Sequence, residues 1–582
     1  MRCRRTRTSP RAHWGDERPD AGRAGLAAQS RAHPDARPAV ARYPQRLGRA
    51  GSSPEIPVPK SHRIAPLSLT RMAAACALGA ALATGPAWSA APASTASAQV
   101  AWLPAAADTD IEKAFALGKA GNKPVLVYWG AKWCPPCNQL KATLFNRQDF
   151  IERSKHFVAV NIDGDKPGAQ KLGARFKVRG YPTMILFNPQ GEEITRLPGE
   201  ADAPAVMNVL QMGLAGGRPV KTVLADARAG KPVSGHEWQM LAFYSWDTDE
   251  AQLVPAAQRA ALLGQLAAAC PAGEGEASTR LMLKSLAGDG AAPADAAARE
   301  RVRKLLADPA ASRSQMDVLV NYAPELAKAL APTAGPERQA TVAALDAALQ
   351  RLQADATLSR ADRLGALIGR VGLARLDQPQ GTLTPQMPAP LLQQVRDESA
   401  RVDREVTDGY ERQAVISSAA YLLGEAGLWK ESDALLQASL AKSHSPYYLM
   451  SHLGGNAKKQ GRKDEALRWY EQAFEKSEGP ATRLQWGTSY LVNLIDLAPQ
   501  DAARIEKTAS QLIREASGQK TAFYERSGRD MKRMGDKLTA WNAMGDHQAV
   551  VARLRAQLKP VCAKLPAGDA QRASCEAVLK KA

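Results

Sequence analysis

The sequence predicts a small α/β domain followed by a much longer region that contains only helices. Between residues 125 and 214, short apolar runs rich in strand-forming residues alternate with helical patterns. Beyond residue 217 the composition shifts to Ala, Leu, Arg, Glu and Gln, with helical periodicity and few strand signals. This region of about 365 residues is too long for one helical core, so stacked helical hairpins are expected.

The α/β domain is predicted to follow the order β-α-β-α-β-β-α, which gives a small mixed sheet flanked by helices. Turn signals such as Asp163-Gly164-Asp165 separate the strands. Pro135 is tolerated in the first helical turn, because its missing N–H costs little there. The predicted elements are a strand over 125–129, a helix over about 134–145, strands over 157–162 and 183–187, a short strand ending at 194, and a helix over 203–214.

The run Trp133-Cys134-Pro135-Pro136-Cys137 joins the first predicted strand to the first helix. A Cys-x-x-Cys pair in this place can make and break one disulfide. The first sulfur would lie at a helix N-terminus, where partial positive charge and free N–H groups favour the thiolate. The second would lie one turn away, close enough to resolve a mixed disulfide. About forty-five residues later, Pro182 follows Tyr181 and is a candidate cis-proline.

These motifs resemble those of a thioredoxin-fold domain, in particular that of periplasmic thiol:disulfide interchange proteins. The resemblance covers residues of roughly 105 to 215, about a fifth of the chain, and includes the stretch 176–183 and the turn 189–192. It implies that Cys134 is the attacking cysteine and Cys137 the resolving one. It also implies that Trp133, Tyr181 and Pro182 bind the substrate, with Pro135, Pro136 and Thr183 in supporting positions.

One position departs from the family pattern. Many thioredoxins place a buried acid six residues before the first cysteine, where it helps to deprotonate the resolving thiol, and this chain has Tyr128 there. The reference pKa values of Asp and Tyr differ by about six units, so the two are not equivalent bases near neutral pH. The proton acceptor for Cys137 is therefore left open.

The two residues between the cysteines indicate the direction of the reaction. Pro135 and Pro136 have no N–H to donate to the Cys134 sulfur, so only the Cys137 N–H remains of that set. No His lies between the cysteines to stabilise a thiolate. A less stabilised thiolate makes the reduced form less stable, so the pair is expected to donate electrons as a reductase or isomerase.

Other chemistries of the cysteine pair require further residues in the sequence. A zinc ribbon needs a second Cys-x-x-Cys, which the sequence lacks, and a covalent haem site needs His where Asn138 stands. A purely structural disulfide stays open as an alternative. Copper delivery is disfavoured, because no Met or His cluster lies near the pair. We therefore expect no metal and no cofactor.

The first hundred residues indicate export. Residues 1–57 are rich in Arg, Ala, Pro and Gly without hydrophobic periodicity, and are expected to be disordered or to precede the true start. Residues 58–98 combine basic residues, an apolar run over 72–83 and cleavage options after Ser89 or Ala98, as a secretory signal does. We expect a periplasmic protein with no transmembrane span after cleavage.

The net charge argues against nucleic-acid binding. The chain carries +19 in total, but residues 1–98 hold fifteen Lys or Arg against five Asp or Glu. The remaining +9 is spread over the mature chain, without an Arg-rich patch interleaved with aromatic residues.

Three cysteines lie outside the dithiol motif and residues 1–98. Cys562 and Cys575 flank the turn Pro566-Ala567-Gly568, so they are predicted to form a structural disulfide between two C-terminal helices. Cys270 lies in an Ala/Leu-rich helix and is expected to be a buried small apolar residue.

A repeat appears in the last part of the helical region, so we divide that region into residues 218–400 and 401–582, after a thioredoxin-like domain over 99–217. Gly427 and Gly461 are 34 residues apart, and other small residues recur at the same offset. This pattern resembles tetratricopeptide repeats, although Met450 and Ala457 stand where that family usually has aromatic residues. The resemblance implies a concave surface that binds a protein or peptide.

Taken together, these observations predict a periplasmic thiol–disulfide oxidoreductase. It would reduce or isomerise disulfides in a protein substrate held by the helical repeats, and an upstream redox partner would recharge the dithiol. The alternative is a scaffold or assembly factor in which the repeats bind partners and the dithiol is accessory.

Overall fold

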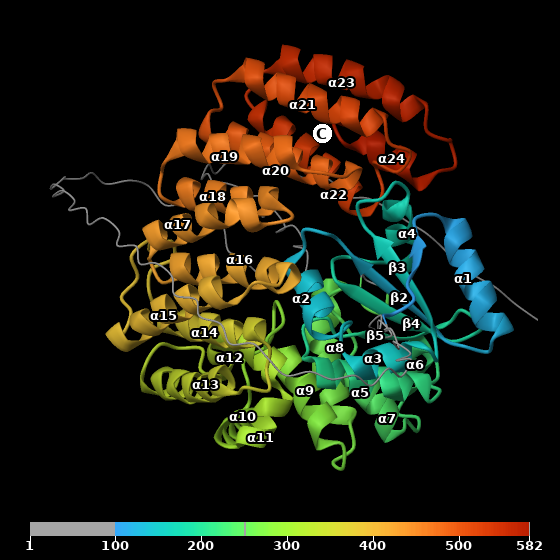
Figure 1. The fold of residues 1–582 in the computed structure, drawn as a ribbon, viewed down its shortest axis with the longest axis vertical. Helices are drawn as coiled ribbons and strands as arrows, with labels where there is room; N and C mark the ends of the chain where they lie inside the picture. Colours follow the sequence, from blue (N-terminus) through green and yellow to red (C-terminus); the bar gives the residue numbers. More distant parts are fainter. Residues whose placement is uncertain (1–98, 250–251, 581–582) are drawn as a thin grey trace, which may run out of the picture. The chain divides into compact units, whose positions relative to one another are not determined.

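The computed structural model describes residues 99–249 and 252–580, and it contains the predicted α/β domain followed by helices only (Figure 1). The predictions for residues 1–57 and 58–98 concern residues outside that description. Within the described residues, no helix is both long and apolar enough to cross a membrane. The domain boundaries proposed from the sequence stay predictions.

A five-stranded mixed sheet forms the centre of the α/β domain. Its strand order is β1-β3-β2-β4-β5, with β1, β3 and β2 parallel and with β4 and β5 antiparallel to their neighbours. In this register Val127 lies opposite both Val160 of β3 and Ile185 of β4. The strands are β1 (Leu103–Ala105), β2 (Val125–Gly130), β3 (Val158–Asp163), β4 (Thr183–Phe187) and β5 (Glu193–Leu197).

Five helices surround the sheet. They are α1 (Asp108–Ala120), α2 (Pro135–Thr143), α3 (Gln148–Ser154), α4 (Ala169–Phe176) and α5 (Ala203–Leu214). The sequence did not predict β1, α1 or α3, and it placed the end of the first helix at residue 145 instead of 143. A three-residue strand and a seven-residue helix are too short to show a clear hydrophobic period.

The two faces of β2 pack into different hydrophobic cores, because side chains alternate along a strand. Val125, Val127 and Trp129 belong to a core that continues into the C-terminal helices. Leu126 and Tyr128 belong to a core shared with α5 and with the helices that follow it. All six residues of β2 are buried, as expected for a central strand covered on both faces.

The helical region begins directly after α5. Its first half contains α6 (Val220–Arg228), α7 (Gly235–Ala242), α8 (Ala256–Ala269), α9 (Gly275–Leu286), α10 (Ala296–Ala307), α11 (Pro309–Ser314), α12 (Met316–Leu330), α13 (Pro336–Ala354), α14 (Arg360–Ala374) and α15 (Ala389–Glu405). Its second half contains α16 (Gly409–Glu425), α17 (Trp429–Ser439), the 3-10 turn η1 (Leu440–Lys442), α18 (Pro446–Lys459), α19 (Lys463–Lys476), α20 (Pro480–Leu497), α21 (Ala502–Ser517), α22 (Glu525–Trp541), α23 (Gln548–Ala563) and α24 (Ala570–Ala577).

Two glycines mark turns between consecutive helices. Gly427 lies between α16 and α17, and Gly461 lies between α18 and α19, each with a positive φ that other residues adopt only with strain. These are the glycines that the sequence places 34 residues apart. The assignment to tetratricopeptide repeats stays a prediction.

The structure places the remaining cysteines as follows. Cys562 of α23 and Cys575 of α24 form a disulfide, with 5.6 Å between their Cα atoms. Cys270 ends α8 as a free, buried thiol, and burial raises its pKa to about 11. At neutral pH this cysteine is therefore protonated and unreactive.

A buried ion pair between Arg280 and Asp317 connects α9 with α12. The Arg280 guanidinium donates to both oxygens of the Asp317 carboxylate, at 2.8 and 2.5 Å, and also to the Ala242 carbonyl at 3.1 Å. Both side chains are buried. The guanidinium also lies 4.0 Å from the centroid of the Phe243 ring. This pair therefore links the start of the helical region to the longer helices that follow.

We predict that Asp317→Asn destabilises the protein by about 3–5 kcal/mol, because it leaves the buried Arg280 charge uncompensated. The free energy of unfolding can be measured by urea titration of the full chain. Glu300→Gln is the matched control: its ion pair with Arg303 is largely exposed, and its loss should cost less than about 0.5 kcal/mol. Equal effects of the two substitutions would contradict the prediction.

Candidate active site

The cysteine pair lies at the start of α2, directly after the loop that follows β2. Cys134 is the N-cap residue of α2, and it forms a disulfide with Cys137 one turn into the helix. The Cys137 N–H donates to the Cys134 sulfur at 3.4 Å. Since Pro135 and Pro136 have no N–H, neither of them can supply a second donor to this sulfur. Pro135 fills the first helical position, where its missing N–H leaves no gap in the helix.

Asn138 holds the turn that carries the cysteines. Its side-chain Nδ2 donates to the Lys132 carbonyl at 2.9 Å and to the Cys134 carbonyl at 2.8 Å. Asn138 is fully buried, so these bonds are shielded from competing water. Asn138, whose identity excludes a covalent haem site, therefore also has a structural role beside the dithiol.

The second motif comes from the loop between α4 and β4. The Tyr181–Pro182 peptide bond is cis. Thr183 donates its hydroxyl to the Gly180 carbonyl at 2.8 Å, and Gln170 donates its side-chain N–H to the Tyr181 hydroxyl at 3.1 Å. The rings of Trp133 and Tyr181 meet edge to face, 6.5 Å apart. The fold thus brings the Cys-x-x-Cys motif and the cis-proline motif together.

Tyr128 does not replace the missing acid. Its hydroxyl is buried with no hydrogen-bond partner among the described residues. Burial, with a smaller effect of the nearby Asp163 charge, raises the pKa of Tyr128 above its ordinary value near 10. Tyr128 also packs against Phe145 in the core that includes Leu140 of α2, whereas Cys137 belongs to the core that continues into the C-terminal helices. It therefore stays a neutral phenol, and it takes no proton from Cys137 at physiological pH.

The dithiol is covered by helices of the C-terminal region. Cys134 and Cys137 are fully buried, and Trp133 is only 3% exposed. Helix α2 packs directly against α16, as Figure 1 also shows. All described residues belong to one compact unit, so this packing lies inside a single body of the chain.

Aromatic residues of α18 and α20 surround the Trp133 side chain. The Tyr448 ring stacks on the Trp133 ring at 5.8 Å, with 21° between the ring planes. Trp486 meets the same ring edge to face, also at 5.8 Å. Trp133 donates its indole N–H to the Thr482 hydroxyl at 3.0 Å, and Gln413 of α16 donates to the Trp133 carbonyl at 3.2 Å.

A buried charge lies beside the cis-proline loop. Arg526 of α22 forms an ion pair with Asp165 at 2.6 Å, with side chains 13% and 11% exposed. The Arg526 guanidinium lies over the rings of Trp133 and Tyr181, at 5.4 and 5.1 Å from their centroids. Its backbone N–H donates to Gln170 at 3.0 Å, and Thr482 donates its hydroxyl to Asp165.

No pattern in the sequence points to these covering residues. They are more than 270 positions from the motifs they touch, and neither spacing nor residue type singles them out. The structure leaves the predicted substrate-binding residues Trp133, Tyr181 and Pro182 together, but it fills the space in front of them with the chain's own helices.

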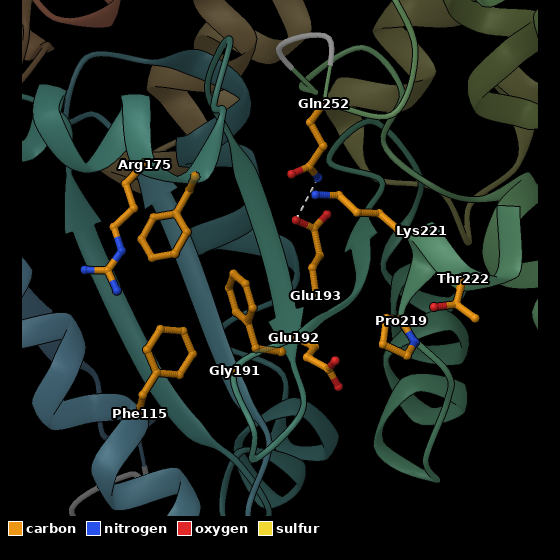
Figure 2. Close-up of a pocket in the computed structure, with 11 residues that line it drawn as sticks. Phe115, Arg175, Gly191, Glu192, Glu193, Pro219, Lys221, Thr222 and Gln252 are labelled. Atoms are coloured by element: carbon orange, nitrogen blue, oxygen red, sulfur yellow. Dashed lines mark hydrogen bonds between the residues drawn. The ribbon is translucent and has the colours of Figure 1, made fainter. Parts of the chain in front are cut away.

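A separate cavity of about 520 Å³ lies away from the dithiol (Figure 2). Phe115, Arg175 and Lys221 are among the residues that line it, and Gln252 donates to Glu193 there at 2.9 Å. It contains none of the residues predicted for the site. Among the described residues, no group of His, Cys, Asp or Glu side chains could hold a metal ion.

Comparisons with known proteins match only the α/β domain. Residues 111–213 match the thioredoxin-like domain family. The thiol:disulfide interchange protein DsbD 2 of Pseudomonas aeruginosa is 30% identical over 113 residues, 19% of this chain and 19% of that protein. A thioredoxin-like protein of Synechocystis is 33% identical over 99 residues, 17% of this chain and 90% of that protein. The predicted fold class, a thioredoxin-like α/β domain followed by a large helical region, is confirmed.

The shared length differs greatly between these relatives. The chain spans about a fifth of the length of the DsbD proteins, but nearly all of the Synechocystis protein. Among solved structures, a thioredoxin from Thermus thermophilus is 27% identical, with a TM-score of 0.18, over 19% of this chain and 85% of that one.

We predict that Tyr128→Phe leaves the titration of the reduced cysteines unchanged. The raised pKa of Tyr128 keeps its hydroxyl protonated throughout the range in which thiols ionise, so removing it takes away no base. Removing an unpartnered buried hydroxyl should also be neutral or stabilising by up to about 1 kcal/mol. The ultraviolet absorbance of the thiolates, followed against pH, measures the first effect; a shifted titration curve would show that Tyr128 takes part.

Proposed function

The chain belongs to the thioredoxin-like family, and from that premise we propose that it is a thiol–disulfide oxidoreductase acting on disulfide-containing proteins. One observation carries the proposal: Cys134 caps α2 in a disulfide with Cys137, beside the Tyr181–Pro182 loop. A disulfide at a helix N-terminus can be opened and closed by exchange, because the helix end favours the thiolate.

The reaction in the reducing direction has two exchange steps. The Cys134 thiolate attacks one sulfur of the substrate disulfide, forms a mixed disulfide and releases one substrate thiolate, which takes up a proton. The Cys137 thiolate then attacks the Cys134 sulfur, releases the second substrate thiolate and closes the Cys134–Cys137 disulfide. Two electrons have passed to the substrate, and an upstream dithiol donor must supply two more for the next cycle.

The surroundings of Cys134 support the reducing direction. The Cys137 amide donates to its sulfur, and the two intervening prolines can add no further N–H. Apart from the helix end, only this one N–H stabilises the thiolate, so the reduced form gains little stability and the disulfide is the favoured product. Tyr128 adds no charge that could change this balance, because it stays neutral.

The periplasm is the compartment we propose. The supporting observations are the secretory pattern over residues 58–98 and the similarity to thiol:disulfide interchange proteins named DsbD. In that setting the substrates are secreted proteins with disulfides, and the helical repeats hold one of them while the dithiol acts.

A scaffold function is the second candidate, and the burial of the dithiol favours it. A disulfide with no exposed sulfur can serve to hold α2 in place without ever exchanging. In that case the helical region would bind partners, and the cysteines would contribute only to stability.

We predict that Cys137→Ala accumulates a mixed disulfide through Cys134 when the reduced protein is incubated with insulin. The resolving thiol is then absent, so the first exchange product persists. Cys134→Ser should form no such adduct. Cys270→Ser, which removes the free, buried thiol outside the Cys-x-x-Cys motif, is the matched control and should behave as the parent does. Non-reducing electrophoresis with peptide mass spectrometry identifies the adduct, and its absence in every form would favour the scaffold.

We also predict a reduction potential near or below that of thioredoxin, about −270 mV, for the Cys134–Cys137 pair. Equilibration of the full chain against dithiothreitol or glutathione buffers measures it. A value near −120 mV, at the oxidising end of the scale, would reverse the proposed direction and make the protein an oxidant of newly secreted chains.

A further inference from the structure

The face that would bind a substrate is already occupied in this structure. In the proposed reaction, a substrate disulfide must reach the Cys134 sulfur while substrate backbone lies beside Tyr181–Pro182. Cys134, Cys137, Tyr181 and Pro182 are all buried. No protein disulfide can make that approach while the helices remain where they are.

We propose that the C-terminal helices form a docking surface for the chain's own dithiol face, and that this contact must open before the cysteines can exchange. The docking surface consists of Gln413, Tyr448, Thr482, Trp486 and Arg526, from α16, α18, α20 and α22. Its partner is the face formed by Trp133, Tyr181 and Asp165. The inference rests on the proposed function and adds a closed state to it.

The contact is specific on both sides. Thr482 links the two motifs of the dithiol face, because its hydroxyl accepts from the Trp133 indole and donates to the Asp165 carboxylate. The Arg526 guanidinium also links the two motifs, because it pairs with Asp165 and lies over both the Trp133 and Tyr181 rings. Each of these residues therefore matches groups on the dithiol face.

The same surface also has features that favour opening. Within the described part of the chain, Trp486 Nε1 and Arg526 Nε are buried without a hydrogen-bond partner. Both N–H groups would gain hydrogen bonds to water on opening. These bonds would offset part of the free energy that is lost when the contact separates. The disulfides of the described residues lie within α2 and between α23 and α24, so neither links the docking surface to the dithiol face.

Opening would present a complete reaction face. Trp133, the cysteine pair and the cis-proline loop are held together by contacts within the α/β domain, such as Gln170 to Tyr181 and Asn138 to the Cys134 carbonyl. Separation from the helices would therefore expose the dithiol without dismantling the loops that carry it. The aromatic docking surface would become accessible at the same moment.

The test measures how fast Cys134 reacts with N-ethylmaleimide in the full chain. The background is Cys137→Ala, so that Cys134 stays a thiol, and the Cys134 adduct is quantified by peptide mass spectrometry. Two substitutions weaken the contact from the helical side only: Thr482→Val, which is nearly isosteric, and Arg526→Ala. Each should raise the rate roughly tenfold or more, because the rate follows the population of the open state.

Matched controls keep the same chemistry inside the helical region. Thr488→Val changes a buried threonine of the same helix, α20, and Arg483→Ala removes an arginine that pairs with Glu515 and lies over the Phe474 ring. Both should leave the Cys134 rate within about twofold of the parent. Circular dichroism and thermal unfolding establish which variants are folded.

A measurement without substitutions covers the case in which a variant does not fold. In the closed state Lys132 and Glu478 are 3.3 Å apart across the contact, so a carbodiimide should couple them and slow the Cys134 reaction further. The proposal is overturned if the parent reacts as fast as the unfolded chain, if the folded contact variants react no faster than the parent, if the controls accelerate equally, or if coupling leaves the rate unchanged.

The rate of insulin reduction separates this inference from the proposed function. It is measured for the parent and for variants that carry the same substitutions, with both cysteines present. Faster maleimide reaction together with faster insulin reduction supports both. Faster maleimide reaction without insulin reduction keeps the closed state and overturns the oxidoreductase. Insulin reduction by the parent at the rate of the contact variants overturns the closed state and keeps the oxidoreductase.

Discussion

The packing of Trp133 against the helical region is the contact on which the arrangement of this protein depends. Trp133 precedes the cysteine pair, so whatever holds its ring also fixes the start of α2 and the sulfurs behind it. Its indole N–H, its carbonyl and its ring each have a partner on a different helix, α20, α16 and α18 respectively. One large side chain thus joins the core of the α/β domain to the core of the helices.

The ion pair between Asp165 and Arg526 gives this packing its register. A buried pair contributes little net stability, since desolvation of both charges offsets their attraction. It is costly, however, to bury either charge without the other, so docking in any shifted position is disfavoured. Thr482 strengthens the choice, because its single hydroxyl needs Trp133 on one side and Asp165 on the other. The apolar contacts hold the surfaces together, and the polar ones decide how they fit.

The chemistry of the sulfurs follows from what the site lacks. Two prolines remove N–H donors from the neighbourhood of Cys134, and a neutral Tyr128 stands where many thioredoxins have an acid. Burial removes water as well, so neither sulfur has a solvent partner in the closed state. A thiolate is poorly stabilised under these conditions. Exposure of the face and activation of the thiol are therefore linked by the same contact.

By itself, the sequence determined the α/β domain, the dithiol at the start of α2, the cis-proline candidate and the helical nature of the rest. These features are predicted by the alternation of apolar residues, by turn residues and by short motifs, all of which act over a few positions. Short elements such as β1 and α3 were not predicted, because they are too short to show a hydrophobic period. Only the tertiary structure decided that Gln413, Thr482 and Arg526 lie against the dithiol face. Such contacts depend on which helix faces pack together, and no local pattern records a pairing between residues hundreds of positions apart.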